Sequence, residues 1–241
     1  QKHSRHNFSA YAELDADVND RINVQVAGRY EDYSDFGSSL NGKAAARFEV
    51  VEGVALRGAI ATGFRAPSLQ QQFYAAQATN NVNGVLLDTV TLPVNNPVAI
   101  ALGAKPLKPE KSVSYSAGFV VTAVPRLNLT VDLYQVDIDD RIVVTDNLTA
   151  NRDAAGNPNG ADPGRTIATI LNNAGFRTVS AARFFVNGLD SRTKGIDAVL
   201  TYRFELGDLG RLSATAGFNY NKTSIRRILA APDRKSTRLN S

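Results

Sequence analysis

Residues 196–221, IDAVLTYRFELGDLGRLSATAGFNYN, contain two runs in which apolar and polar residues alternate around a glycine-containing turn. In the first run Ile196, Ala198 and Leu200 share one face, and the second run repeats the pattern. A period of two places successive side chains on opposite faces of a β-strand, whereas an amphipathic helix needs apolar residues three and four positions apart. The stretch therefore predicts two antiparallel strands joined at Gly207–Asp208.

The same alternation recurs along the chain. Six further stretches show it, at 8–18, 22–31, 43–50, 54–65, 112–122 and 127–133. Most are close to the ~9–11 residues that a tilted strand needs to cross a bilayer. We therefore predict an all-β protein, an antiparallel meander of about eight strands.

The phase of the alternation changes inside the sixth stretch. Apolar residues occupy odd positions up to Leu133, and then Tyr134, Val136 and Ile138 take over at even positions. Either a β-bulge or the emergence of the strand from a bilayer would explain this change.

The predicted connections fall into two length classes. Short turns at Asn19–Asp20, Glu52–Gly53, Pro125–Arg126 and Gly207–Asp208 follow the odd-numbered strands. Connections after the even-numbered strands are longer, at roughly 34–42, 65–110 and 143–192, and we expect the last two to be polar, unstructured loops that face a ligand. Outer-membrane barrels have short periplasmic turns at one rim and long extracellular loops at the other.

Composition limits the other classes of protein. The 241 residues include 43% hydrophobic and 21% charged residues, with no cysteine and a net charge of +4. No apolar run is long enough for a transmembrane helix, and a disulfide framework or thiolate metal site is excluded. Because no basic face with interleaved aromatic residues is present, we expect no nucleic-acid partner.

Five segments, in this order and spacing, resemble the C-terminal half of the β-barrel of TonB-dependent receptors. They are GRYEDYSDFG at 28–37, TGFRAPSL at 62–69, LKPEKS at 107–112, VDLYQVDIDDRI at 131–142 and TKGIDAVLTYRF at 193–204. The resemblance covers most of residues 7–221.

This resemblance implies a fold, a location and partners. It implies a transmembrane barrel of about 22 strands with a plugged lumen, of which these would be eight, forming an open curved sheet when alone. It implies energy-coupled import of a scarce nutrient (an iron–siderophore complex, a cobalamin or a carbohydrate) across the outer membrane of a Gram-negative bacterium. The implied partners are outer-membrane lipid, the small-molecule ligand, and the TonB energy-coupling complex acting through an N-terminal plug. We find neither plug nor final strand in the sequence, and expect a fragment.

Two short segments match family motif positions. Arg65, Ala66, Pro67 and Ser68 match the point where a strand enters a long extracellular loop, and Lys108, Pro109 and Glu110 match the start of the next strand. Proline lacks the N–H donor and holds the preceding residue extended, so strand pairing should end at Pro67. We interpret both segments as structural; ligand contact is the alternative.

Candidate catalytic and metal sites are weak. No nucleophile elbow, phosphate loop or dinucleotide fingerprint occurs, so we predict that the protein is not an enzyme and needs no cofactor. We interpret His3 and His6 as an incidental pair rather than a metal site. Asp137, Asp139 and Asp140 could offer oxygen ligands to calcium, but a solvated, partly paired charge cluster is the favoured interpretation.

Residues 1–232 are predicted to be part of the barrel, and 233–241 (DRKSTRLNS) to be an irregular tail, natural or artefactual. Three alternatives stay open: a complete eight-stranded outer-membrane barrel with an adhesive or structural role, a soluble β-sandwich that binds carbohydrate, and an outer-membrane hydrolase. The sandwich would bury its apolar face against a second layer of the same chain.

Overall fold

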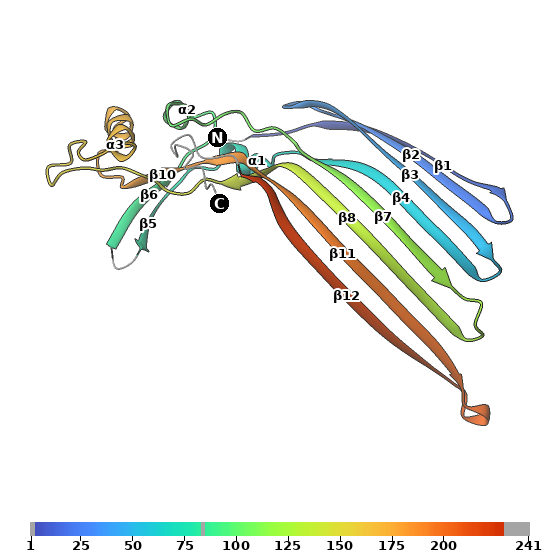
Figure 1. Cartoon of the computed structure of the whole chain (residues 1–241). Helices are drawn as coiled ribbons and strands as arrows, with labels where there is room; N and C mark the ends of the chain where they lie inside the picture. Colours follow the sequence, from blue (N-terminus) through green and yellow to red (C-terminus); the bar gives the residue numbers. More distant parts are fainter. Residues whose placement is uncertain (1–2, 83–84, 229–241) are drawn as a thin grey trace, which may run out of the picture.

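The computed structural model describes residues 3–82 and 85–228, and its main feature is one curved antiparallel sheet (Figure 1). Eight strands lie side by side in chain order. They are β1 (Asn7–Asn19), β2 (Ile22–Tyr33), β3 (Gly37–Val51), β4 (Val54–Arg65), β7 (Glu110–Val121), β8 (Leu127–Val144), β11 (Phe185–Glu205) and β12 (Arg211–Ile228). The predicted eight-stranded meander is confirmed.

The two faces of the sheet differ in polarity, because the register keeps like residues together. Leu200 on β11 lies opposite Leu129 on β8 and Ala216 on β12, so these three side chains share what we call the apolar face. Val199 lies opposite Thr130 and Gly217, which belong to the other, polar face.

Large apolar side chains of the apolar face have no covering layer. Phe8 is 66% exposed, Leu14 65% and Phe218 60%. Across the described residues β1 and β12 each pair with a single neighbour, so the sheet is open. These observations argue against a closed eight-stranded barrel and against a sandwich, which would cover the apolar face.

The four predicted tight turns all lie at one rim of the sheet. Asn19 Oδ1 accepts hydrogen bonds from the backbone N–H groups of Arg21 and Ile22, both at 2.9 Å. Gly53 has φ +73°, and a Cβ there would collide with the Ala123 backbone. The turn at Gly207–Leu209 is a short 3-10 helix, η1.

Two predictions about the opposite rim are wrong. The connection at 34–42 is shorter than predicted, because β3 begins at Gly37 and pairs with β2 from Tyr33 onward. The two long connections are not unstructured. They contain α1 (Leu69–Phe73), β5 (Ala76–Val82), β6 (Val85–Thr91), α2 (Pro97–Ala101), β9 (Leu148–Thr149), α3 (Gly164–Asn173) and β10 (Ala181–Arg183).

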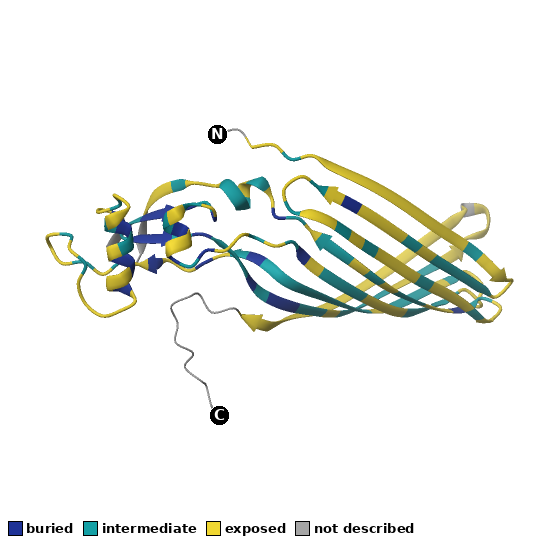
Figure 2. Ribbon diagram, turned by 90° about the horizontal axis from the view of Figure 1, so that it is seen from above, coloured by how far each residue is buried: buried dark blue, intermediate teal, exposed yellow. Residues whose placement is uncertain are grey.

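These two connections build a second, four-stranded sheet in the order β5–β6–β10–β9, which we call the loop unit together with α2 and α3. β10 pairs in parallel with β6, so Ala182 lies opposite Val90. Buried apolar residues from both connections, including Leu92, Leu171 and Phe184, form one core. Figure 2 shows the buried residues concentrated there, while the long strands are mostly exposed or half-buried. Apolar burial therefore stabilises the loop unit more than the large sheet.

The phase change after Leu133 is not a bulge at that position. Residues Leu129–Asp139 keep an unbroken register with β7, and the irregular pairing with β11 lies further along, opposite Asn187–Ser191. Tyr134 instead lies on the polar face and covers Gly195, where a Cβ would collide with its ring. That β8 leaves a bilayer after Leu133 stays a prediction.

No helix among the described residues is long and apolar enough to cross a membrane. The predicted irregular tail, residues 233–241, lies outside the described residues.

Candidate functional site

The motif residues Arg65 and Glu110 meet where the sheet joins the loop unit. They are direct cross-strand partners at the end of β4 and the start of β7. Arg65 Nε donates to Glu110 Oε2 at 2.9 Å, and Arg65 Nη2 donates to Oε1. Oε1 also accepts the backbone N–H of Ile142 on β8 at 2.7 Å. One carboxylate with 8% side-chain exposure thus holds three strands together.

Replacing Glu110 by alanine should loosen this junction. The buried N–H of Ile142 would lose its acceptor, and the guanidinium of Arg65 would lose its partner. An unsatisfied buried donor costs about 1–3 kcal/mol, so we expect a loss of that size in the free energy of unfolding of the protein, measured by urea titration in detergent. Glu52→Ala, at an exposed turn, is the control. Equal losses for the two variants would contradict the assignment.

Pro67 and Ser68 turn the chain from β4 into α1. Ser68 caps the helix: its Oγ accepts the N–H of Gln71 at 3.0 Å, and its own N–H donates to Gln71 Oε1 at 3.0 Å. This reciprocal capping box satisfies two backbone donors at a helix start. Buried Pro67 ends the pairing of β4, as predicted, and its carbonyl accepts from Arg5 Nη2 at 2.6 Å. Ala66 is the half-buried link between strand and proline.

Arg5 extends this junction to the β2–β3 turn. It donates to Asp35 at 3.0 and 2.7 Å, and its guanidinium lies 5.1 Å from the ring centre of Phe36. Burial would raise the pKa of the Asp35 carboxyl, but hydrogen bonds from Arg5 and Gln72 outweigh it and lower this pKa below its ordinary value. Sequence reasoning missed this cluster, although Asp35 and Phe36 lie within the GRYEDYSDFG segment.

Lys108 and Pro109 lie at the second crossing between the sheet and the loop unit. The Asn187 side chain accepts the N–H of Lys108 at 2.8 Å and donates to the carbonyl of Lys108 at 2.8 Å and of Asp140 at 2.7 Å. Asn187 was not predicted, because it is 79 residues from Lys108. The motif positions thus have structural roles, and ligand contact by any of them stays a prediction.

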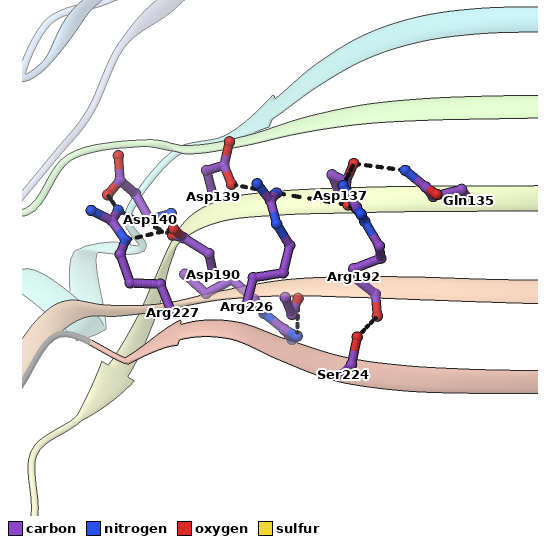
Figure 3. Close-up of polar contacts among 11 residues, drawn as sticks. Gln135, Asp137, Asp139, Asp140, Asp190, Arg192, Ser224, Arg226 and Arg227 are labelled. Carbon is purple, nitrogen blue, oxygen red and sulfur yellow. Dashed lines mark hydrogen bonds and ion pairs between the residues drawn. The ribbon is translucent and has the colours of Figure 1, made fainter. Parts of the chain in front are cut away.

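The predicted Asp137–Asp140 cluster consists of ion pairs (Figure 3). Asp137 pairs with Arg192 at 2.6 Å, Asp139 with Arg226 at 3.2 Å, and Asp140 with Arg227 at 3.6 Å. Asp190, which sequence reasoning missed, receives Arg227 Nε at 2.6 Å.

This pairing leaves the carboxylates engaged with arginine rather than grouped for calcium. Among the described residues no group of three or more His, Cys, Asp or Glu side chains could hold a metal ion. The ring of His3 stacks on Phe73 at 3.7 Å. The favoured interpretation, a paired charge cluster, agrees with this geometry.

The polar face carries ion pairs and a hollow. Arg57 Nε donates to Asp132 Oδ1 at 2.8 Å across Gly118, where a Cβ would collide with the carboxylate. Small side chains of β4 and β7 leave a hollow of about 340 Å³ in front of Tyr134 and Val136. This face thus presents charged and polar groups across β4, β7 and β8.

The loop unit has a second, polar hollow at its surface. It measures about 490 Å³ and is lined by residues of the 154–158 segment and of α3, together with Arg177 and Thr178. Behind it, Arg152 donates to Asn172 Oδ1 at 3.1 Å and to the Phe176 carbonyl at 3.0 Å, at the C-terminal end of α3. A cation at the C-terminal end of a helix stabilises that helix, so these contacts give Arg152 a structural role.

Comparison with known proteins identifies a matching family and several similar structures. The family model for TonB dependent receptor-like β-barrels matches residues 1–241. The siderophore receptor PirA from Pseudomonas aeruginosa is 17% identical, with TM-score 0.64, and the match covers 91% of this chain and 35% of that structure. The ferric enterobactin receptor PfeA from the same organism, as a variant in complex with enterobactin, is 16% identical, with TM-score 0.62 and coverages of 90% and 27%.

The RagAB peptide importer is also similar, at 15% identity and TM-score 0.58, covering 93% of this chain and 22% of that structure. No curated protein matches the chain. The chain thus spans about a third or less of the length of these solved structures. At such low identity the structural likeness shows the fold alone.

Proposed function

The chain belongs to the family of TonB-dependent receptor-like β-barrels, and on this premise we propose that it forms part of an outer-membrane receptor that imports a scarce nutrient. The receptor would lie in the outer membrane of a Gram-negative bacterium. It would act as a transporter rather than an enzyme.

One observation carries the proposal: the apolar face of the long sheet is exposed, while its polar face carries ion pairs. A strand that separates lipid from an aqueous or plugged lumen needs this division, because lipid-facing residues must be apolar. The loop unit lies at the rim opposite the short turns, where a barrel of this kind would meet the outside (Figure 1).

An iron–siderophore complex is the ligand we propose first. Two of the structural relatives named above are a siderophore receptor and a ferric enterobactin receptor, which favours this class over a cobalamin or a carbohydrate. The two long connections, about 65–110 and 143–192, would present the ligand-facing surface. Energy would come from the TonB complex, acting through a plug domain on the polar face.

Uptake by the full-length receptor tests this proposal. Cells that lack their other siderophore receptors and express this one are supplied with radiolabelled iron as ferric enterobactin, with and without a protonophore. We expect accumulation that stops when the proton gradient collapses. Accumulation that is insensitive to the protonophore would contradict energy-coupled import, and uptake of labelled cobalamin instead would replace the proposed ligand.

A further inference from the structure

The apolar face of β11 and β12 ends abruptly at two lysines. Outward side chains are apolar from Phe204 to Ile196 on β11 and from Leu212 to Tyr220 on β12. Eight residue steps of about 3.3 Å make this belt roughly 26 Å long along the strand, enough for much of a bilayer when the strand is tilted. The next outward residues, toward the loop unit, are Lys194 and Lys222.

These two lysines share one position on the surface. They are direct cross-strand partners, both are exposed, and the residue opposite Lys194 on its other side is uncharged Gln135. In the part of the chain that the structure describes, neither ammonium group forms an ion pair. Like charges directly opposite each other destabilise a sheet. A negative charge between the two ammonium groups would offset their repulsion.

Nearby acids do not supply the missing counter-charge. Asp137, the nearest outward carboxylate, accepts from Arg192 Nε at 2.6 Å and lies 3.7 Å from Arg226. Asp139 is paired with Arg226 at 3.2 Å, as Figure 3 shows. The outward group therefore keeps a net charge of +2, with Lys194 and Lys222 nearest the belt. It contains six basic residues (Lys111, Arg192, Lys194, Lys222, Arg226, Arg227) and four acids (Asp137, Asp139, Asp140, Asp190).

We propose that Lys194 and Lys222 bind phosphate groups of lipid headgroups in the outer leaflet. The inference rests on the proposed function in one respect, that the apolar face meets lipid and the loop unit lies outside. Lysine stems extend along the apolar surface while the ammonium group reaches the headgroup level. An anionic phosphate between the two strands would remove the repulsion between the ammonium groups and complete the interface between belt and loop unit.

Lipid binding to the full-length receptor tests the proposal. Native mass spectrometry in neutral detergent would compare phosphatidic acid with phosphatidylcholine of matched acyl chains. We expect preference for phosphatidic acid, and an affinity about 30-fold weaker in the Lys194→Gln/Lys222→Gln variant, since each surface lysine contributes about a fivefold factor. Lys194→Arg/Lys222→Arg should restore binding. If the double variant fails to fold, Lys222→Gln alone should weaken binding about fivefold.

The matched control is Lys43→Gln/Lys105→Gln, because Lys43 lies on the polar face, bonded to Gln25, and Lys105 lies in a connection. Equal loss in both double variants, or no preference for phosphatidic acid, would overturn the proposal. Displacement of the lipid by equimolar inorganic phosphate would show a free-anion site and overturn it as well. Lipid binding is measured without uptake, so its result does not depend on the outcome of the import assay.

Discussion

Replacing Phe184 by alanine is expected to cause the largest loss of stability, about 3–5 kcal/mol, and to confine it to the loop unit. The Phe184 side chain is fully buried, and it packs in the core that Leu92 and Leu171 share. Alanine would leave a cavity between segments that are held together mainly by this core. Hydrogen exchange of the full-length receptor should show faster exchange in β6, β9, β10 and α3, with β1–β4 unchanged.

Ile100→Ala supplies the control for this prediction. Ile100 lies on α2 beside fully buried Ala99, but its own side chain is 55% exposed. Its replacement should change exchange in the loop unit little. If Phe184→Ala left exchange in the loop unit as it is in the natural protein, the described core would not be the element that holds the two connections together.

Arginine at position 200 is the second large expected effect. Leu200 is the middle residue of the outward apolar belt, between Leu129 and Ala216. A charged side chain on the lipid face costs about 2–4 kcal/mol at the middle of a bilayer. We therefore expect Leu200→Arg to lower the free energy of unfolding of the protein in phosphatidylcholine vesicles by that amount, measured by urea titration.

Val199→Arg makes this experiment a matched comparison, because Val199 is the adjacent residue on the polar face. Its cross-strand neighbours are Thr130 and Gly217, and under the proposed function this face meets the lumen rather than lipid. We expect less than half of the loss seen at position 200. Equal losses at the two positions would mean that the two faces do not meet different surroundings.

The strands of the long sheet were predictable because each carries its own signal. Alternation around Leu200 or Val24 is local, and tight turns such as Glu52–Gly53 lie directly between two such runs. The register then follows, since a slip by one residue would move a whole strand to the wrong face. The family resemblance added the class of barrel, which alternation alone leaves open.

The loop unit could not be predicted in this way. β6 and β10 pair at Val90 and Ala182, and no short-range pattern links residues that are so far apart in sequence. β6 and β10 are also too short for an alternating pattern to distinguish a strand from a loop. The site followed the same division: Arg65 and Glu110 were found by motif, whereas Arg5 and Asn187 act through contacts that only the folded chain creates.

The most direct test of the central claim is the accessibility of nitroxide labels placed singly along β11 in vesicles. The chain has no cysteine, so labels at 196–204 add the only reactive thiols within it. We predict that positions 196, 198, 200, 202 and 204 respond to lipid-soluble oxygen, and that 197, 199, 201 and 203 respond to a water-soluble nickel complex or are shielded by a plug. Labels at the even positions that neither reagent reaches would show the apolar face packed against protein, and would contradict the account.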